Sequence, residues 1–536
     1  MAYRIGIDFG TCFSYIAYGA ESGGAEAVHT LINPVDRLPY EIPSIFFHGE
    51  NEKDYFLCGI DAIDHFDSVR DSKDEYRYAV KHIKQSLLKE GSLTTFKLKG
   101  GEITSKEIVV HFFKHIKELT EESLRAEDHN EGYDLTLEAV IAVPVIFTPQ
   151  ERSILIDSAT EAGITVVGLI EEPVAIAIDY IEHLKNKNDL EPILVYDLGG
   201  GTIDATCVKY HPGNTQHVKL YDGNIAEIPS EKTYEVISTS GKRIGGLKWD
   251  DELSALISSG YLNEYKSLPP YDPTRSFSKR VTEAKHMLTK RELVSMPFTH
   301  LSGQVPENRE IKIDRTAFDK KTKSLLNETL DCIREISNKC GLKNGSKVRV
   351  ILSGGSSRMP QVRTGVIKIL EEEIGVTISN KKSMLFRHEK AVASGATRYS
   401  NALKFYDPNT APNMYGISVY DESGNLKDEK FLIDKGQPLP FTKMAWELDA
   451  PSGSIQVVVT EKYDRVSSYL TQTDKIIKMD LSLKSPGKII GNLKMFKGGV
   501  IKFEVLNPEN GETNTTFYSI NTFPHPRRVK IFTKSS

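Results

Sequence analysis

The spacing of apolar residues divides the chain into two parts that meet near residue 400. In the first part, short β-branched runs alternate with longer segments in which apolar residues recur every three or four positions. This alternation is typical of strands and helices stacked in α/β layers. After residue 400, runs with a period of two, such as 479–483 and 501–505, replace the helical pattern. The pattern predicts an α/β part followed by a small all-β sandwich.

Two helices in the first part are marked by their ends. Thr104 and Glu107 form a capping-box pair ahead of a one-sided apolar stripe. Thr148 and Glu151 repeat this pair around a proline, and Gly163 follows at the position where that helix should end. We therefore expect helices to begin near residues 105 and 149.

The same patterns set the expected domain boundaries. We expect one α/β unit over residues 1–400. Residues 401–413 carry two prolines and polar residues and predict a linker. The all-β domain then covers residues 414–536, with a turn at Ser423-Gly424.

Composition and charge exclude several classes of function. The 536 residues carry 68 Lys and Arg against 73 Asp and Glu, a net charge of −5, which offers no basic field to nucleic acid or to an anionic membrane. The longest apolar run, at 139–147, is interrupted by Pro144 and is too short to span a bilayer. The five cysteines form no C-x-x-C pair, and no signal peptide is visible, so a cytoplasmic location is expected.

A short motif occurs twice in the first part and carries the candidate chemistry. Asp8-Phe-Gly-Thr11 follows one β-rich run, and Asp197-Leu-Gly-Gly-Gly-Thr202 follows another. An aspartate at a strand end can hold the water shell of a magnesium ion, and glycine turns let backbone N–H groups approach phosphate oxygens. A single copy would read as an ordinary hairpin turn. Two copies predict two similar lobes that grip a triphosphate and its metal between them.

A third glycine motif follows the apolar run 348–352. Ser353-Gly-Gly-Ser-Ser-Arg358 leads into a proline-initiated helix, which suits close approach by a nucleoside, with Arg358 able to stack on a base. Alone it is a weak signal, since Gly-Gly turns are common. The chain has no G-x-x-x-x-G-K-[ST] segment, so it is not a P-loop protein.

These three motifs resemble the two phosphate motifs and the adenosine motif of the actin-like ATPases. Further segments resemble those of the seventy-kilodalton heat-shock chaperones within that superfamily. They are the hinge-like segment 141–152, the connecting segment 169–177, the upper-lobe segments 243–250 and 283–288, and, more weakly, the hairpin segment 431–440. The resemblance implies a two-lobed actin-like ATPase domain that binds nucleotide, over residues 1–400, with an insertion in its upper lobe at about 224–314. A peptide-binding β sandwich would follow it.

The resemblance also implies roles for individual residues. Asp8, Asp197 and Asp204 would hold magnesium, Glu172 would position the attacking water, and Lys81 would stabilise the transferring phosphate, with Asp197 and Thr202 also counted in the catalytic set. From the residues alone, Lys81 would read as a solvated helix lysine. The implied contacts to ATP or ADP are Gly10, Thr11, Cys12, Phe13, Gly199, Gly200, Gly201, Gly245, Gly246, Lys285, His286, Thr289, Gly354, Gly355, Ser356, Arg358 and Glu389.

Several positions depart from the family pattern. Cys12 stands where a threonine is usual, His286 replaces a basic residue that stacks on adenine, and Glu389 replaces an aspartate. Cys12 reads either as a small buried filler or as a thiol whose oxidation blocks nucleotide binding. The linker stretch is poor in leucine, and we expect no helical lid after the sandwich, so peptide should exchange fast.

The leading interpretation is an ATP-hydrolysing chaperone whose nucleotide state controls binding of extended apolar peptides or unfolded clients. A J-domain co-chaperone and a nucleotide exchange factor are further partners that the resemblance implies. A nucleotide-gated scaffold with little or no turnover is the main alternative. A sugar kinase of the same superfamily would lack the β tail, and a polymerising cytoskeletal protein would lack both that tail and the upper-lobe insertion.

Overall fold

A computed structural model of the chain describes most of its residues. These are 2–19, 28–31, 41–48, 56–69, 78–89, 92–128, 135–187, 190–211, 215–219, 225–229, 233–270, 277–302, 305–386, 390–402, 414–433, 441–464, 471–495, 500–506, 513–519 and 528–530. Glu389 and the predicted linker beyond residue 402 lie outside this part of the chain.

The first lobe is built on a sheet of order β13-β12-β1-β2-β3, with β4 beside β2. β1 pairs antiparallel with β2 and parallel with β12, which in turn pairs parallel with β13. The strands are β1 (Ala2–Asp8), β2 (Phe13–Gly19), β3 (Val28–Thr30), β4 (Ile42–Pro43), β12 (Thr136–Val143) and β13 (Thr165–Glu171).

The second lobe repeats this design in a sheet of order β22-β21-β14-β15-β18-β31. Here β14 pairs antiparallel with β15 and parallel with β21. The strands are β14 (Ile193–Leu198), β15 (Ile203–His211), β18 (Thr233–Lys242), β21 (Lys347–Ser353), β22 (Thr377–Ile378) and β31 (Arg528–Lys530). The repeated motif of the sequence is therefore a repeated hairpin, with each aspartate at the end of its first strand.

The predicted helix ends of the first lobe are confirmed. Thr104 and Glu107 form a reciprocal capping box at the start of α2 (Ser105–Asp128), and Thr148 and Glu151 form another at α3 (Pro149–Glu161). Beyond α3, Gly163 has a φ of +84°, the left-handed conformation in which glycine ends a helix without strain. α2 packs against α3 and encloses a large apolar core beside the first sheet.

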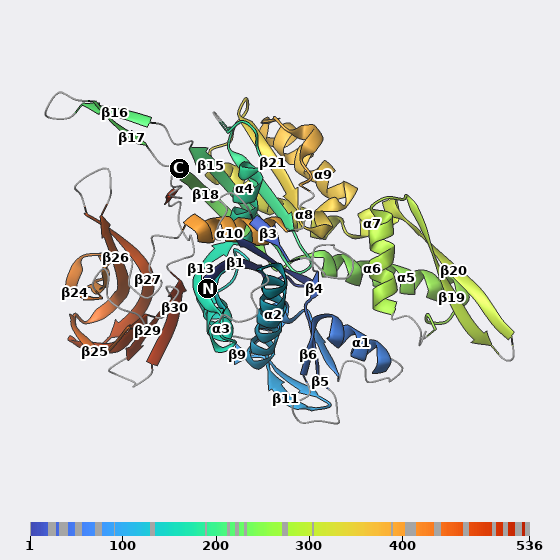
Figure 1. The fold of residues 1–536 in the computed structure, drawn as a ribbon, viewed down its shortest axis with the longest axis horizontal. Helices are drawn as coiled ribbons and strands as arrows, with labels where there is room; N and C mark the ends of the chain where they lie inside the picture. Colours follow the sequence, from blue (N-terminus) through green and yellow to red (C-terminus); the bar gives the residue numbers. More distant parts are fainter. Residues whose placement is uncertain are drawn as a thin grey trace.

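Two helices join the lobes. α4 (Glu172–Glu182) and α10 (Ala391–Ala402) pack against each other, and one apolar core contains residues from both helices and from both sheets. Figure 1 shows α10 between the two sheets, and α4 packs against β14 and β15 of the second sheet. The second sheet is also covered by α8 (Lys323–Lys339) and α9 (Pro360–Ile367), with the short helical turns η3 (Gly355–Arg358), η4 (Lys368–Ile374) and η5 (Lys381–Ser383) nearby.

Each lobe carries a smaller addition. On the first lobe it consists of β5 (Ile45–His48), β6 (Phe56–Cys58), α1 (Gly59–Val69), β7 (Ala79–Lys81), η2 (Ile83–Ser86), β8 (Leu88–Lys89), β9 (Ser92–Leu93), β10 (Thr95–Leu98) and β11 (Gly101–Thr104). On the second lobe it consists of β16 (Thr215–Lys219), β17 (Ile225–Pro229), α5 (Gly246–Tyr265), α6 (Phe277–Leu288), β19 (Leu293–Ser302), β20 (Val305–Asp314) and α7 (Arg315–Lys321). Most of the second set falls in the range expected for an insertion.

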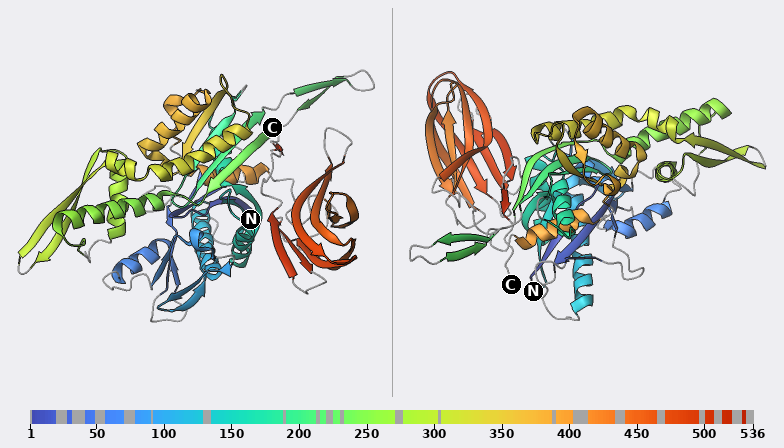
Figure 2. Two further views of the ribbon diagram at one scale, coloured as in Figure 1. Left: turned by 180° about the vertical axis from the view of Figure 1, so that it is seen from behind. Right: turned by 90° about the horizontal axis from the view of Figure 1, so that it is seen from above.

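The C-terminal part forms two four-stranded antiparallel sheets, of order β24-β23-β26-β27 and β25-β28-β29-β30. Its strands are β23 (Met414–Tyr420), β24 (Leu426–Ile433), β25 (Phe441–Ala450), β26 (Gly453–Asp464), β27 (Thr471–Leu483), β28 (Gly487–Met495), β29 (Val500–Leu506) and β30 (Thr513–Ser519). One apolar core lies between the sheets, and Val457 and Val459 belong to it. In Figures 1 and 2 these strands form a body beside the lobes, with β30 against α3.

The α/β prediction for the first part and the strand predictions at 479–483 and 501–505 are thus confirmed, as is the turn at Ser423-Gly424, where Gly424 N–H donates to the carbonyl of Asp421. Within the described residues, no helix combines the length and the apolar character that crossing a bilayer would demand.

Candidate nucleotide site

The candidate site lies where the two repeated hairpins end. Asp8 is the last residue of β1, and Asp197 is the last but one of β14, directly opposite Asp204 on β15. Glu172 is the first residue of α4, which follows β13 without a loop. These four carboxylates come from both lobes and converge because each lobe presents the end of its central strands to the other.

A buried lysine joins the carboxylates, and it is Lys84. Its ammonium donates to Glu172 Oε1, and only 4% and 8% of the two side chains are exposed. Burial alone would lower the pKa of Lys84, but Glu172, Asp8 and Asp204 together raise it above its ordinary value. Lys84 therefore stays charged inside a negative cluster.

The predicted Lys81 is elsewhere. Its side chain is exposed, and its ammonium lies 3.9 Å from the centre of the Phe66 ring. His82, between the two lysines, has a φ of 58°, a left-handed conformation that turns the chain sharply before η2. The structure thus brings Lys84 to the carboxylates and leaves Lys81 outside the cluster.

The spacing of apolar residues around Lys84 could have identified it as a buried lysine. Val80, Ile83, Lys84 and Leu87 have the i, i+3, i+4, i+7 spacing of a buried stripe, and all four are buried. A lysine on such a stripe needs a charged partner, which marks it as a site candidate.

The carboxylates repel one another strongly. Burial, followed by the charge of Glu172, raises the pKa of Asp8 to about 7, and the same two causes raise the pKa of Asp204 to about 7. The pKa of Asp197 is also raised well above its ordinary value, by burial and by the neighbouring carboxylates. Such a cluster is stabilised by an added cation.

Asp204 supplies a direct indication of where a cation belongs. Its Oδ1 accepts a 2.7 Å hydrogen bond from the N–H of Val145, whereas its buried Oδ2 has no partner among the described residues. Within that same part of the chain, no three His, Cys, Asp or Glu side chains are placed to chelate an ion directly. The donor set therefore fits a hydrated magnesium ion held through its water shell, as expected for Asp8, Asp197 and Asp204.

The glycine loops of the two lobes face each other above this cluster. A Cβ built on Gly200 would lie 2.8 Å from Cys12 Sγ, and one on Gly201 would lie 2.7 Å from Thr11 Oγ1. Thr202 closes the second loop, where its carbonyl accepts from the N–H of Gly199. Backbone N–H groups in this arrangement are suited to phosphate oxygens.

The start of α5 completes the second loop. The N–H groups of Gly246 and Leu247 donate to the carbonyls of Gly199 and Gly200 over 2.9 Å. A Cβ on Gly245 would meet the backbone of Gly200 and Gly201 at 2.5–2.6 Å, so only glycine allows this approach.

Lys285 and Ser356 lie against the same loop. Lys285 Nζ donates to the Gly246 carbonyl over 2.9 Å and to Asp250 over 2.8 Å, while Ser356 Oγ donates to the Gly199 carbonyl over 3.0 Å. Gly354, with a φ of +79°, brings the third motif up against β14. The three glycine motifs therefore meet at one place.

The remaining predicted contacts lie at the edge of this site. His286 and Arg358 are exposed, and burial together with the charges of Lys285 and Arg358 lowers the pKa of His286. Thr289 Oγ1 donates to the carbonyl of His286. Phe13 is 44% exposed beside the first loop. At Gly355 a Cβ would meet nothing within 4 Å, and Glu389 lies outside the described residues.

Cys12 stands among the phosphate-facing groups but is not activated. Its Sγ lies 3.8 Å from Nδ1 of His82, and Nδ1 also lies 3.3 Å from the carbonyl oxygen of Thr11. Burial raises the pKa of the Cys12 thiol and lowers that of His82, so the neutral forms of both are favoured. These pKa directions favour the buried-filler interpretation over a reactive sensor.

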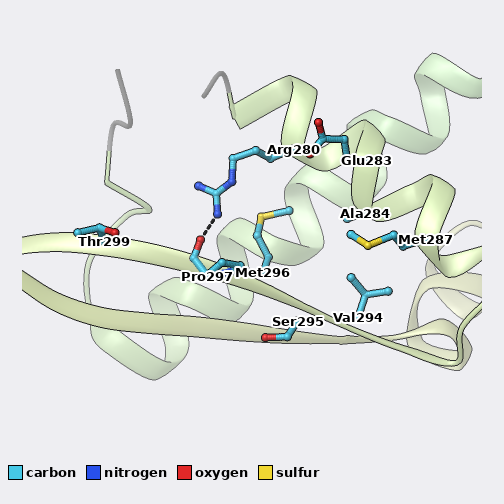
Figure 3. Close-up of a pocket in the computed structure, with 9 residues that line it drawn as sticks. All are labelled: Arg280, Glu283, Ala284, Met287, Val294, Ser295, Met296, Pro297 and Thr299. Carbon is cyan, nitrogen blue, oxygen red and sulfur yellow. Dashed lines mark hydrogen bonds between the residues drawn. The ribbon is translucent and has the colours of Figure 1, made fainter. Parts of the chain in front are cut away.

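A separate cavity of about 190 Å³ lies between α6 and β19 (Figure 3). Arg280, Glu283, Ala284 and Met287 line it from one face of α6, and the Arg280 guanidinium donates to the carbonyl of Pro297 on β19. None of the predicted nucleotide contacts lines this cavity, so it is distinct from the candidate site.

Comparison with known proteins finds relatives among proteins named as chaperones. A family model described as "Hsp70 protein" matches residues 65–405. The chain is 27% identical to the chaperone protein DnaK of Metamycoplasma hominis over 380 residues, which is 69% of this chain and 55% of the relative. It is 30% identical to the DnaK of Mycoplasmopsis synoviae over 292 residues, 53% of this chain and 43% of that protein. The matched region spans about half the length of these curated relatives.

Proposed function

This chain belongs to the Hsp70 family, and on that basis we propose that it is an ATPase of the actin-like type that works as a chaperone. The observation that carries the proposal is the buried Lys84–Glu172 pair among three raised-pKa aspartates, beneath glycine loops from both lobes. Charged groups are retained in a buried cluster of this kind when they meet a charged ligand.

The residues divide the chemistry of hydrolysis between them. The ammonium of Lys84 offsets negative charge on the transferring phosphoryl group, and the carboxylate of Glu172 orients the water that attacks it. Asp8, Asp197 and Asp204 hold the water shell of magnesium, which when bound would neutralise phosphate charge. Lys84 takes the role that the sequence resemblance implied for Lys81.

The two glycine loops bind the phosphates. Their N–H groups and the hydroxyls of Thr11 and Thr202 contact phosphate oxygens. Lys285, in the last turn of α6, and Ser356, in η3, lie on the same side. His286 and Arg358 border the base. A neutral His286 binds adenine less tightly than a cation would.

We also propose that the two C-terminal sheets bind extended apolar peptides of unfolded clients and that nucleotide state controls this binding. The relatives are named chaperone proteins, and the all-β body lies beside α3, near enough to respond to movement of the lobes. J-domain and nucleotide-exchange partners belong to the same proposal. The second candidate is a nucleotide-gated scaffold. The observation that favours it is His286, the proposed adenine contact, which is exposed and neutral.

Single-turnover ATP hydrolysis, with and without a pool of apolar peptides, tests both candidates. Slow hydrolysis that peptide accelerates and that Lys84→Met abolishes supports the chaperone ATPase. ATP binding without hydrolysis contradicts it and supports the scaffold. Hydrolysis that ignores peptide supports the ATPase but contradicts its coupling to the β domain.

A further inference from the structure

Two of the five cysteines lie in contact in the second lobe. Cys207 is on β15, and Cys340 is the residue that caps the C-terminus of α8. The side chains of Cys207 and Cys340 lie close enough to interact, and neither cysteine is in a disulfide. Neither belongs to a glycine loop or to the carboxylate cluster.

The register of the surrounding elements explains why these two cysteines meet. Cys332 and Cys340 lie two turns apart on the face of α8 that packs against β15 and β18. Between them on α8, Glu335 accepts a 2.6 Å hydrogen bond from the hydroxyl of Ser240, which pairs with Ala205 on β15. Cys340 therefore lies further along β15 than Ala205. Cys207, two positions after Ala205, is the next residue on the same face of that strand. This placement selects Cys340, not Cys332, as the neighbour of Cys207.

The two thiols differ in access. Cys207 is fully buried, whereas Cys340 is partly exposed at the helix end. The contact with Cys340 and burial raise the pKa of Cys207, so it persists as a thiol. An oxidant in solution therefore reaches Cys340 first, and Cys207 is placed to react with the oxidised Cys340 as the resolving thiol.

We propose that Cys207 and Cys340 form a redox modification site at which a hydroperoxide closes an intramolecular disulfide. The Cys340 thiolate attacks the peroxide oxygen, which breaks the O–O bond and leaves a sulfenic acid and, with hydrogen peroxide, one water molecule. Cys207 sulfur then attacks Cys340 sulfur, and the sulfenic oxygen leaves as a second water with the Cys207 proton. The thiols lose two electrons, the peroxide gains them, and a thiol reductant reverses the step.

The bond would close a chain segment that contains most of the upper-lobe addition. α5, α6, the β19–β20 pair and α7 all lie between the two cysteines, as do the nucleotide-side residues Gly245 and Lys285. Closing so long a segment restricts the unfolded chain, so the oxidised second lobe should melt at a higher temperature than the reduced one.

The test uses the full-length chain treated with dilute hydrogen peroxide, quenched by alkylation and mapped by peptide mass spectrometry without reduction. We expect a peptide that links Cys207 to Cys340, with the loss of two hydrogens, and an upward shift in Tm that dithiothreitol reverses. Cys332→Ser, on the same helix and in the same core, should retain the link, whereas Cys340→Ser should lose it. Cys207→Ser should leave Cys340 as a sulfenic acid that dimedone traps.

Three results would overturn the proposal. They are oxidation of Cys340 without a link in the wild-type chain, a link from Cys340 to another cysteine, and no reaction of Cys340 under conditions that oxidise other thiols of the chain. Cys340 is only partly buried at a helix end, so Cys340→Ser should fold. The test therefore stays decisive even if Cys207→Ser fails to fold.

Discussion

The ammonium of Lys84 and the carboxylate of Glu172 form a buried ion pair at the point where the two lobes meet. The pair joins η2 of the first lobe to the first residue of α4, and its charges act on Asp8 and Asp204. A pair with this position can respond to both a phosphate and a metal ion.

Replacing Lys84 by methionine should lower single-turnover ATP hydrolysis by roughly 10²–10³-fold, because a positive charge beside the transferring phosphate is lost. Lys81→Met, a matched change three residues away on an exposed side chain, should leave the rate unchanged. Equal losses in both variants would remove Lys84 from its proposed role.

The same substitution should also destabilise the fold by roughly 3–5 kcal/mol, because it leaves Glu172 as an uncompensated buried charge. The double variant Lys84→Met with Glu172→Gln should recover much of that stability but no hydrolysis. Denaturant unfolding measures the first effect, and the rate assay measures the second. A double variant that regains activity would show that the pair is structural.

Gly245→Ala should lower affinity for a fluorescent ATP analogue at least tenfold. Its Cβ would lie 2.5 Å from the backbone nitrogen of Gly201, so the phosphate-binding loop must move. Gly260→Ala on the same helix meets nothing closer than 3.7 Å and serves as the control. We expect Gly260→Ala to bind normally and to gain up to about 1 kcal/mol in stability, since alanine favours a helix. Normal binding by Gly245→Ala would contradict the proposed loop.

The stability of the ligand-free protein should depend on pH through its buried carboxyls. Folding raises the pKa of Asp8 and Asp204 from 3.8 to about 7, so between these values the folded chain holds more protons than the unfolded chain. The free energy of unfolding should therefore fall as pH rises through this window, by up to roughly 1.4 kcal/mol per pH unit for each group.

Thermal unfolding at several pH values measures this slope. Asp204→Asn keeps the acceptor for Val145 N–H and should reduce the dependence of stability on pH. Adding magnesium with ADP should reduce it as well. Asp251→Asn, an exposed carboxylate on α5, should leave it unchanged. A slope that survives Asp204→Asn at full size would show that other groups set it.

Cys12 should alkylate slowly at neutral pH, because burial raises the pKa of its thiol. Bound ATP should slow the reaction further if the first glycine loop holds phosphate. Peptide mapping after timed iodoacetamide treatment gives the rate at Cys12, with the partly exposed Cys340 as an internal comparison. Rapid labelling that ATP does not affect would revive the interpretation of Cys12 as a reactive sensor and weaken its placement at the phosphates.

Local signals in the sequence predicted much of this fold. Capping residues, strand alternation and the repeated aspartate–glycine motif each depend on neighbours within a few positions, and the structure confirms them at Thr104, Thr148 and the two hairpins. The buried lysine of the candidate site was harder to identify because its placement depends on one left-handed residue. His82 has no feature in the sequence that marks such a turn, and the turn decides whether Lys81 or Lys84 points inward.

The packing of α10 has a consequence for how the chain folds during synthesis. A Cβ on Gly6 in β1 would lie 2.2 Å from the carbonyl of Ala393, and one on Gly395 would lie 1.9 Å from that of Ala175, so α10 lies directly against both the first strand and α4. During synthesis, β1 must therefore wait for nearly four hundred further residues before α10 is available to pack against it. Contacts this distant in sequence slow folding and leave apolar surface open to aggregation, so the nascent chain should need protection by chaperones.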